Sequence, residues 1–176
     1  MTDWYDGLVI AGGGSRRLGG GDKTALQVGG RPLRDIAIDA LAGARQVLVI
    51  GVDGDLVEDP PGGGPLAAIA AGLSRVTAPV VAVLAADLPF VTAEVTERLV
   101  AEASAVAVDD GGRAQYLLAA YRTDDLRGAI PTDPGGQSMR SVIDQLKPQL
   151  VELDGSPPPW WDCDTQAELD QARSWT

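Results

Sequence analysis

The chain alternates short, uninterrupted apolar runs with segments in which apolar residues recur every three or four positions. A short apolar run is typical of a strand buried on both faces, and the longer spacing is typical of an amphipathic helix. The pattern therefore predicts strands joined by helices. Strands are expected at residues 7–11, 47–50, 56–57, 80–85, 105–108, 116–121 and 150–153, and helices at 33–41, 65–73, 92–99, 138–147 and after 165.

Several of the expected helices begin or end at residues that favour helix termini. Pro32 precedes the helix at 33–41, and Gly43 follows it as a plausible stop. Thr92 is an N-cap candidate, and Thr165 followed by Glu168 forms the pattern of a capping box. These signals support the helix assignments and place the segments between them in loops.

The order of elements indicates the fold class. Strands that alternate with helices predict an α/β, Rossmann-like domain of three layers with a mostly parallel central sheet. The run at 80–85 is the most apolar and is expected to be the central strand, ending at Asp87. A chain of 176 residues has the size of one domain, which we expect to span 1–176. Ligands of such sheets bind at the carboxyl ends of the strands.

Composition excludes disorder as the main state, because hydrophobic residues make up 45% and charged residues 22% of the chain. The longest uncharged stretch, residues 60–74, is shorter than the 18 or so residues of a membrane span, so no transmembrane helix is expected. Asp3 and Asp6 precede the first apolar run, where a signal peptide would carry basic residues. We interpret the protein as cytoplasmic.

The counts of cysteine, histidine and charge narrow the chemistry. One cysteine, Cys163, permits no internal disulfide or cysteine-rich zinc site, and the absence of histidine excludes Ser/His and Cys/His relays. Any metal must therefore be bound by oxygen. The net charge of −11 argues against nucleic acid or an anionic membrane as the main partner. Five basic residues near the N-terminus still allow a local anion site: Arg16, Arg17, Lys23, Arg31 and Arg34.

A glycine-rich segment, residues 12–23, directly follows the first expected strand. Glycines without Cβ atoms let backbone N–H groups approach and surround a phosphate, so the segment predicts a phosphate cradle. It differs from a P-loop, because Asp22 stands before Lys23 where glycine is required. It differs from the dinucleotide fingerprint, because Arg17 occupies the third glycine position. The alternative interpretation is a flexible surface loop.

Motifs along nearly the whole chain resemble those of the molybdenum cofactor guanylyltransferases, within the wider group of sugar-phosphate-type nucleotidyltransferases. The N-terminal signature of that family is similar to Leu-Ala-Gly-Gly-x-Ser-x-Arg-Met-Gly-x-Asp-Lys-Ala. The matching segments here are Ile10-Ala11-Gly12-Gly13-Gly14-Ser15-Arg16-Arg17-Leu18-Gly19, Asp22-Lys23-Thr24, Gly30-Arg31-Pro32-Leu33, Glu58-Asp59, Gly64-Pro65-Leu66-Ala67, Ala86-Asp87-Leu88-Pro89 and Asp162-Cys163-Asp164-Thr165.

The resemblance implies a nucleotidyltransferase domain that uses GTP and Mg²⁺. Such an enzyme transfers GMP to the terminal phosphate of molybdenum-bound molybdopterin, releases pyrophosphate and forms the guanine dinucleotide cofactor. Implied partners are GTP, the molybdopterin-type cofactor, and molybdenum-insertion or molybdoenzyme-maturation proteins. By the same resemblance, Ile10, Ala11, Gly12 and Gly13 line the nucleotide, Lys23 binds its phosphates, Asp59 contacts it, and Asp87 contacts it and Mg²⁺.

Several positions depart from the family pattern. Ile50 replaces an asparagine often found after the second strand, and Asp162 and Asp164 replace the two asparagines of the closing motif. The basic segment thought to face the pterin keeps one positive charge, Arg140. Two alternatives therefore stay open. One is a transferase that uses CTP, or another acceptor such as a sugar phosphate or a redox cofactor's phosphate. The other is a nucleotide-binding regulatory or partner-binding module without turnover.

The charged residues suit phosphoryl transfer, which depends mainly on positioning and on charges around the phosphorus. Lys23 and Arg17, together with Arg16, are expected to share the polyphosphate. Asp87 is expected to hold Mg²⁺, with a plain turn as the alternative. Asp162 is the predicted second metal ligand, supplied from the last strand, although Asp164 or a simple capping role is also open. An acceptor phosphate is already an anion and needs no general base.

Two tryptophans after the proline tract at 157–159 have two interpretations. Trp160 and Trp161 can stack on a pterin, or they can form a small core beneath the C-terminal helix. The burial habit of tryptophan favours the small core. Gln115 and Tyr116 lie, by resemblance alone, where the family approaches its acceptor.

Overall fold

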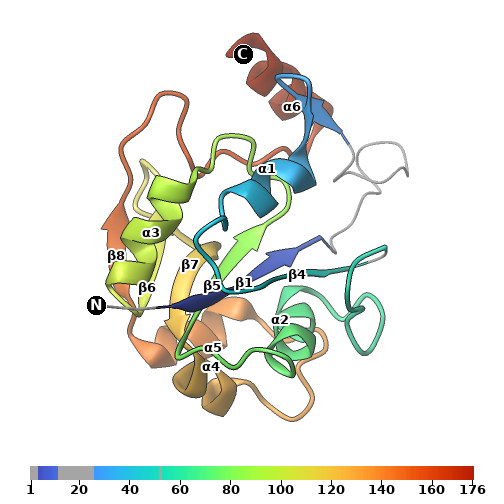
Figure 1. The fold of residues 1–176 in the computed structure, drawn as a ribbon, viewed down its shortest axis with the longest axis vertical. Coiled ribbons are helices and arrows are strands. Elements are labelled where there is room, and N and C mark those ends of the chain that lie inside the picture. Colours follow the sequence, from blue (N-terminus) through green and yellow to red (C-terminus); the bar gives the residue numbers. More distant parts are fainter. Residues whose placement is uncertain (1–3, 12–25, 52) are drawn as a thin grey trace.

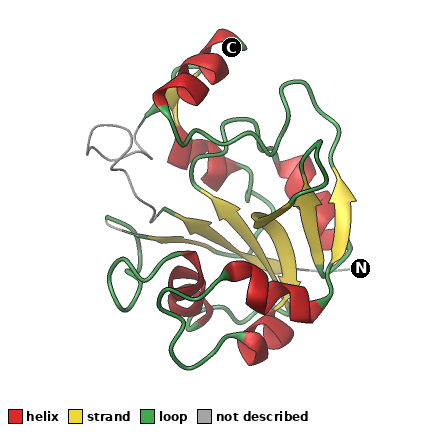
Figure 2. Cartoon of the chain, turned by 180° about the vertical axis from the view of Figure 1, so that it is seen from behind, coloured by secondary structure: helices red, strands yellow, loops and turns green. Residues whose placement is uncertain are grey.

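The computed structural model describes residues 4–11, 26–51 and 53–176 of the chain. Six strands form one central sheet, and helices cover both of its faces (Figures 1 and 2). This arrangement confirms the predicted three-layer α/β fold. In spatial order the strands are β4 (Val47–Ile50), β1 (Tyr5–Ile10), β5 (Val80–Ala85), β7 (Ala114–Arg122), β6 (Ala105–Val108) and β8 (Gln149–Glu152).

The sheet is mostly parallel, as expected. Strand β1 pairs in parallel with β4, with Ile10 beside Ile50, and with β5, with Ile10 beside Ala85. Strand β7 runs antiparallel to both β5 and β6, and β8 is parallel to β6. The carboxyl ends of β4, β1 and β5 therefore meet at one edge of the sheet, where the sequence places its candidate chemistry.

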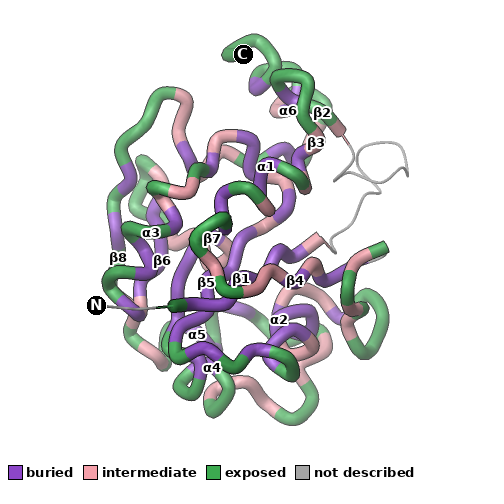
Figure 3. The backbone as a smooth tube through the Cα atoms, in the orientation of Figure 1, coloured by how far each residue is buried: buried purple, intermediate pink, exposed green. Residues whose placement is uncertain are grey.

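Two hydrophobic clusters fill the spaces between the sheet and its helices. Strand β1 is buried along its whole length and contributes to both, with Val9 in one cluster and Leu8 and Ile10 in the other. Helices α1 (Leu33–Asp39) and α3 (Ala93–Ala101) cover the first face. Helices α2 (Pro65–Leu73), α4 (Thr123–Ala129) and α5 (Met139–Leu146) cover the second. Buried segments run through the centre of the molecule in Figure 3.

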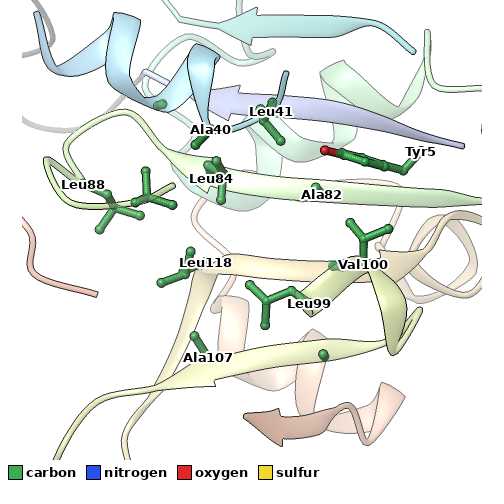
Figure 4. Packing of buried hydrophobic residues seen from close by; sticks show 14 of the residues in the cluster. Tyr5, Ala40, Leu41, Ala82, Leu84, Leu88, Leu99, Val100, Ala107 and Leu118 are labelled. Atoms are coloured by element: carbon green, nitrogen blue, oxygen red, sulfur yellow. The ribbon is translucent and has the colours of Figure 1, made fainter. Parts of the chain in front are cut away.

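The first cluster shows how closely the strands and helices pack. Leu84 of β5 and Leu118 of β7 lie on the same face of the sheet, and Leu99 and Val100 of α3 close over it (Figure 4). On the opposite face Gly72 of α2 lies against β1, where an added Cβ would stand 2.8 Å from Cδ2 of Leu8. The missing side chain thus lets α2 approach the sheet.

The structure corrects several predicted boundaries. Helix α1 ends at Asp39, and the chain continues in tight turns in which the N–H of Leu41 donates to the carbonyl of Ile38. Residues 56–57 form no strand; Leu56 makes a single parallel bridge to Ile50. Strand β7 is longer than predicted, and β8 begins at Gln149 and ends at Glu152. The predicted helix at 65–73 is confirmed, with Pro65 in its first turn.

Two features escaped the sequence pattern. Strands β2 (Gln27–Val28) and β3 (Arg31–Pro32) form a hairpin around Gly29 and Gly30, which both have positive φ. Helix α4 starts at Thr123, directly at the end of β7. The C-terminal helix α6 (Gln166–Ser174) packs against this hairpin, away from the main sheet (Figure 1). In the described ranges, no helix has the length and apolar character needed to cross a membrane.

The carboxylate of Asp6 is fully buried at the start of β1 and ties three segments together. Arg45 donates to it through Nε at 3.0 Å, Gln46 through Nε2 at 2.9 Å, and the amides of Thr77 and Ala78 at 2.8 and 3.1 Å. Burial alone raises the pKa of Asp6, but these hydrogen bonds outweigh it and lower the pKa to about 2. The charged form of Asp6 therefore holds the segments before β4 and β5 against β1.

We predict that Asp6→Asn lowers the free energy of unfolding by about 2–3 kcal/mol at pH 7, because Arg45 loses its counter-charge and the buried hydrogen bonds to the carboxylate lose their charged acceptor. Since the folded pKa lies below the unfolded value, the stabilisation is present above about pH 4 and is lost as pH falls toward 2. Urea unfolding at several pH values measures the difference between parent and variant. That difference should shrink with acid, and the exposed control Asp154→Asn should show none; a difference constant with pH would refute the assignment.

Candidate active site

Two backbone hydrogen bonds just past the ends of the strands join the carboxyl ends of β4, β1 and β5. The N–H of Ala11 donates to the carbonyl of Ile50 at 2.8 Å, and the N–H of Ala86 donates to the carbonyl of Ile10 at 3.0 Å. Ile10 is buried and Ala11 is half-buried. Both residues lie at the carboxyl end of β1, and their nucleotide-lining role stays a prediction. Gly12, Gly13, Arg17 and Lys23, predicted to continue this site, fall outside the described residues.

Asp87 is half-buried and lies just beyond β5, at the same edge. Its carbonyl accepts a hydrogen bond of 3.2 Å from the N–H of Cys163. This contact brings the segment 162–164 beside Asp87, although the two lie far apart in the sequence. Asp162 and Asp164 are exposed on either side of the buried Cys163. Two of the predicted carboxylate positions are therefore neighbours in the fold.

The position of Asp162 differs from the prediction in one respect. It was expected to follow directly from the last strand, but β8 ends at Glu152 and Asp162 lies in the long loop before α6. The intervening prolines cannot donate to a strand ladder, and Pro159 is buried, so the chain leaves the sheet before it reaches Asp162. The backbone contact to Asp87, rather than the strand, brings Asp162 to the site.

A metal ion at this edge would be bound by few protein ligands. Among the residues that the structure describes, no three potential ligand side chains of Asp, Glu or Cys gather at one point. Mg²⁺ commonly takes one or two carboxylates and completes its shell with phosphate oxygens and water. A half-buried Asp87 with Asp162 in the adjoining segment fits that donor set, and both assignments stay predictions.

The segment that carries Asp162 is anchored by the start of α6. The hydroxyl of Thr165 accepts from the N–H of Glu168 at 3.2 Å, and Oε2 of Glu168 accepts from the N–H of Thr165 at 2.7 Å. This confirms the predicted capping box. The indole of Trp161 donates to the carbonyl of Glu168 at 3.3 Å, which fixes the residue next to Asp162.

A small hydrophobic cluster lies beneath α6, as the tryptophan pattern indicated. Its buried members include Cys163 and Leu169, and Phe90 and Trp161 pack against it. The rings of Trp161 and Trp175 meet edge to face at 4.8 Å, and Phe90 lies 5.7 Å from Trp175. The core role favoured for Trp161 is confirmed, whereas Trp160 packs against the main cluster instead. Because Phe90 follows Asp87 closely, this cluster fixes both sides of the candidate metal position.

Asp59 lies in the loop that joins β4 to α2, three residues after Leu56, which bridges to Ile50 at the end of β4. It is exposed, and its predicted contact with the nucleotide stays a prediction. The loop is braced from another part of the chain, because the N–H of Gly136 donates to the carbonyl of Gly63 at 2.8 Å. Residues near 136, from the segment implied to face the acceptor, therefore lie beside the loop that carries Asp59.

The first residues of β7 also reach this edge, because β7 runs antiparallel and Leu118 pairs with Leu84 near the end of β5. Tyr116 donates from its hydroxyl to Oδ1 of Asp144 at 2.9 Å, and Arg140 donates from Nε to Oδ2 of Asp144 at 3.2 Å. Burial, followed by the hydrogen bond and charge of Asp144, raises the pKa of Tyr116. Sequence reasoning missed this three-residue cluster, because only the fold brings α5 to the end of β7.

In a mostly parallel sheet that helices cover on both faces, nucleotides and other ligands bind at the carboxyl edge, where this chain places its acidic side chains. Residues 7–150 match the family model described as MobA-like NTP transferase domain. The chain belongs to this family of nucleotidyltransferases.

Relatives with assigned names agree with this placement. The molybdenum cofactor guanylyltransferase of Acidiphilium cryptum is 30% identical over 95% of this chain and 93% of its own length. That of Rhodopseudomonas palustris is 40% identical, but the match covers only 39% of this chain and 38% of the relative. Among solved structures, the molybdopterin-guanine dinucleotide biosynthesis protein A of Archaeoglobus fulgidus covers 96% of this chain and 97% of its own, with a TM-score of 0.69 at 20% identity. That last likeness concerns the fold.

We predict that Thr165→Ala lowers the free energy of unfolding by about 1 kcal/mol, because the capping box loses its reciprocal hydrogen bonds. Urea unfolding followed by tryptophan fluorescence measures the loss and reports on Trp161 at the same time. Thr132→Ala, at an exposed loop position, serves as the control. Equal stability of Thr165→Ala and the parent would show that the cap does not hold the segment of Asp162.

Proposed function

We propose that the protein transfers GMP from GTP to the terminal phosphate of molybdenum-bound molybdopterin, releasing pyrophosphate and forming the guanine dinucleotide cofactor. The observation that carries the proposal is the similarity, across almost the full length of both chains, to a relative named molybdenum cofactor guanylyltransferase. The contact between Cys163 and Asp87 supports it, because that contact gathers carboxylates at the edge where a triphosphate binds in such sheets.

The proposal assigns the predicted site residues to the nucleotide, its phosphates and the metal. Ile10 and Ala11 line the nucleotide, and the glycine-rich segment, with Lys23 and Arg17, neutralises its phosphates. Asp87, with Asp162, holds Mg²⁺, which supplies positive charge to the phosphate oxygens during transfer. Asp59 contacts the nucleotide from the loop before α2.

The acceptor phosphate attacks the α-phosphorus of GTP, and pyrophosphate leaves. The acceptor is already an anion at neutral pH, so the reaction needs no protein base to remove a proton. This fits a chain that contains no histidine. We place the acceptor beside the cluster of Tyr116, Arg140 and Asp144, where a cation and a phenol lie at the same edge. Protein partners that supply molybdenum or receive the product belong to the same proposal.

We predict that GTP with Mg²⁺ raises the melting temperature by several degrees, since a ligand at 100 times Kd stabilises the fold by about 2.7 kcal/mol. ATP and CTP should raise it less. Differential scanning fluorimetry with the three nucleotides, each with and without Mg²⁺, measures the effect. A larger shift with CTP would point to a cytidylyltransferase, and no shift with any nucleotide would remove the basis for a transferase.

We predict that Asp87→Asn and Lys23→Ala stay folded but form product and release pyrophosphate at least about 100-fold more slowly, the scale expected when a charge stabiliser is lost. The assay incubates GTP, Mg²⁺ and molybdenum-loaded molybdopterin, and follows the dinucleotide by mass spectrometry. The matched control Asp125→Asn, an exposed carboxylate at the start of α4, should keep full activity.

If the parent protein releases no pyrophosphate under these conditions, the proposed reaction is wrong. Undiminished turnover by a folded Asp87→Asn would instead remove Asp87 from the metal site and leave it with the role of a turn residue.

A further inference from the structure

Glu58 is an acidic residue at the same edge that the proposed reaction does not use. Strand β4 ends at Ile50, and Leu56, six residues later, forms a parallel bridge with Ile50. Leu56 packs on the core beneath α2. Glu58 stands two residues further along, which places it just beyond the carboxyl end of β4.

The two oxygens of the Glu58 carboxylate have different surroundings. Oε1 accepts a hydrogen bond of 3.1 Å from the N–H of Gly62. Oε2 is buried, and within the part of the chain that the structure describes no donor reaches it. An acceptor shielded from water without a donor destabilises the fold, and more so if it is charged. A ligand that brings a donor to this oxygen would recover that energy.

The turn whose Gly62 N–H binds Oε1 of Glu58 consists of three glycines, residues 62–64, and so carries no side chains. A Cβ added at Gly62 or Gly64 would meet nothing within 4 Å, and both residues have positive φ. The turn is closed by the N–H of Gly63, which donates to the carbonyl of Pro60 at 2.8 Å. A planar ligand that approached Glu58 from this turn would meet backbone rather than side chains.

The position of Glu58 relative to Asp87 indicates which part of a nucleotide lies near it. Asp87 follows β5, whereas Glu58 follows Leu56, which bridges to β4 on the side away from β1. Three strand spacings separate the bridge at Leu56 from the end of β5, about 14 Å. A nucleotide whose phosphates and metal lie at Asp87 thus places its base over the end of β4, next to Glu58.

The bases differ in what they present to a carboxylate. Guanine offers two adjacent donors on its pairing edge, the ring N1–H and the exocyclic amine. Adenine and cytosine present a ring nitrogen that accepts, which a carboxylate repels. We propose that Oε2 of Glu58 accepts hydrogen bonds from the pairing edge of guanine and thereby sets the preference for GTP. This inference rests on the proposed function, because it takes the bound nucleotide to be the transferase substrate.

The test is a change of base preference in Glu58→Gln. The amide oxygen can keep the hydrogen bond from Gly62, whereas the amide nitrogen puts a donor where guanine also has donors. Xanthine carries a carbonyl in place of the exocyclic amine, so XTP should suit the variant. We expect the ratio of GTP to XTP affinity, measured by isothermal titration calorimetry, to fall at least tenfold in Glu58→Gln. Glu152→Gln, exposed on β8, should keep the parent ratio.

A second measurement needs no variant. ITP has the N1–H of guanine but lacks the exocyclic amine, so the parent protein should bind it about tenfold more weakly than GTP. Equal affinity for GTP and ITP in the parent, or an unchanged ratio of GTP to XTP in Glu58→Gln, would overturn the role of Glu58 and leave the proposed function intact. A parent protein that prefers CTP to GTP would overturn the proposed function and this inference together.

Discussion

The candidate site depends on the parallel pairing of β1 between β4 and β5. All six residues of β1 are buried, so the strand can sit only in the interior of the sheet, with helices on both faces. Asp6 is a charged residue in this buried strand, and its hydrogen bonds to Arg45 and Thr77 compensate for the loss of water around its carboxylate. Because these three strands run the same way, whatever follows each of them arrives at one edge.

The residues that follow those strands are joined by long-range backbone contacts. The N–H of Cys163 binds the carbonyl of Asp87, and the N–H of Gly136 binds the carbonyl of Gly63. Each contact connects a loop after a parallel strand with a segment from the last third of the chain. The loops after β4 and β5 are therefore each held by a hydrogen bond from a segment that follows β7 in the sequence.

Much of the fold could be predicted from periodicity. The runs at 47–50, 80–85 and 105–108 form strands with the predicted bounds, because a short continuous apolar run is typical of a strand buried on both faces. The hairpin of β2 and β3 could not be predicted in this way. Its strands have two residues each and owe their pairing to Gly29 and Gly30 and to the packing of α6.

The sequence predicted individual residues of the candidate site, but not how the fold places them relative to one another. Motif order identified Asp87 and the segment around Asp162, but periodicity assigned Asp162 to a strand end that it does not occupy. The ion pair of Arg140 and Asp144 and its contact with Tyr116 depend on how α5 packs on β7, which no local pattern records. Glu58 is visible in the sequence as part of a motif, but only the fold shows that its Oε2 is buried with no donor among the described residues.

In the proposed function a nucleotide lies across the ends of β4, β1 and β5 with its metal at Asp87. A crystal structure with a non-hydrolysable GTP analogue and Mn²⁺ tests this placement directly, because the anomalous signal of Mn²⁺ locates the metal without reference to the rest of the map. We expect a single strong peak at the distance of a carboxylate–metal bond from Asp87, with the base over the end of β4. A metal peak remote from Asp87, or a nucleotide bound away from this edge, would contradict it.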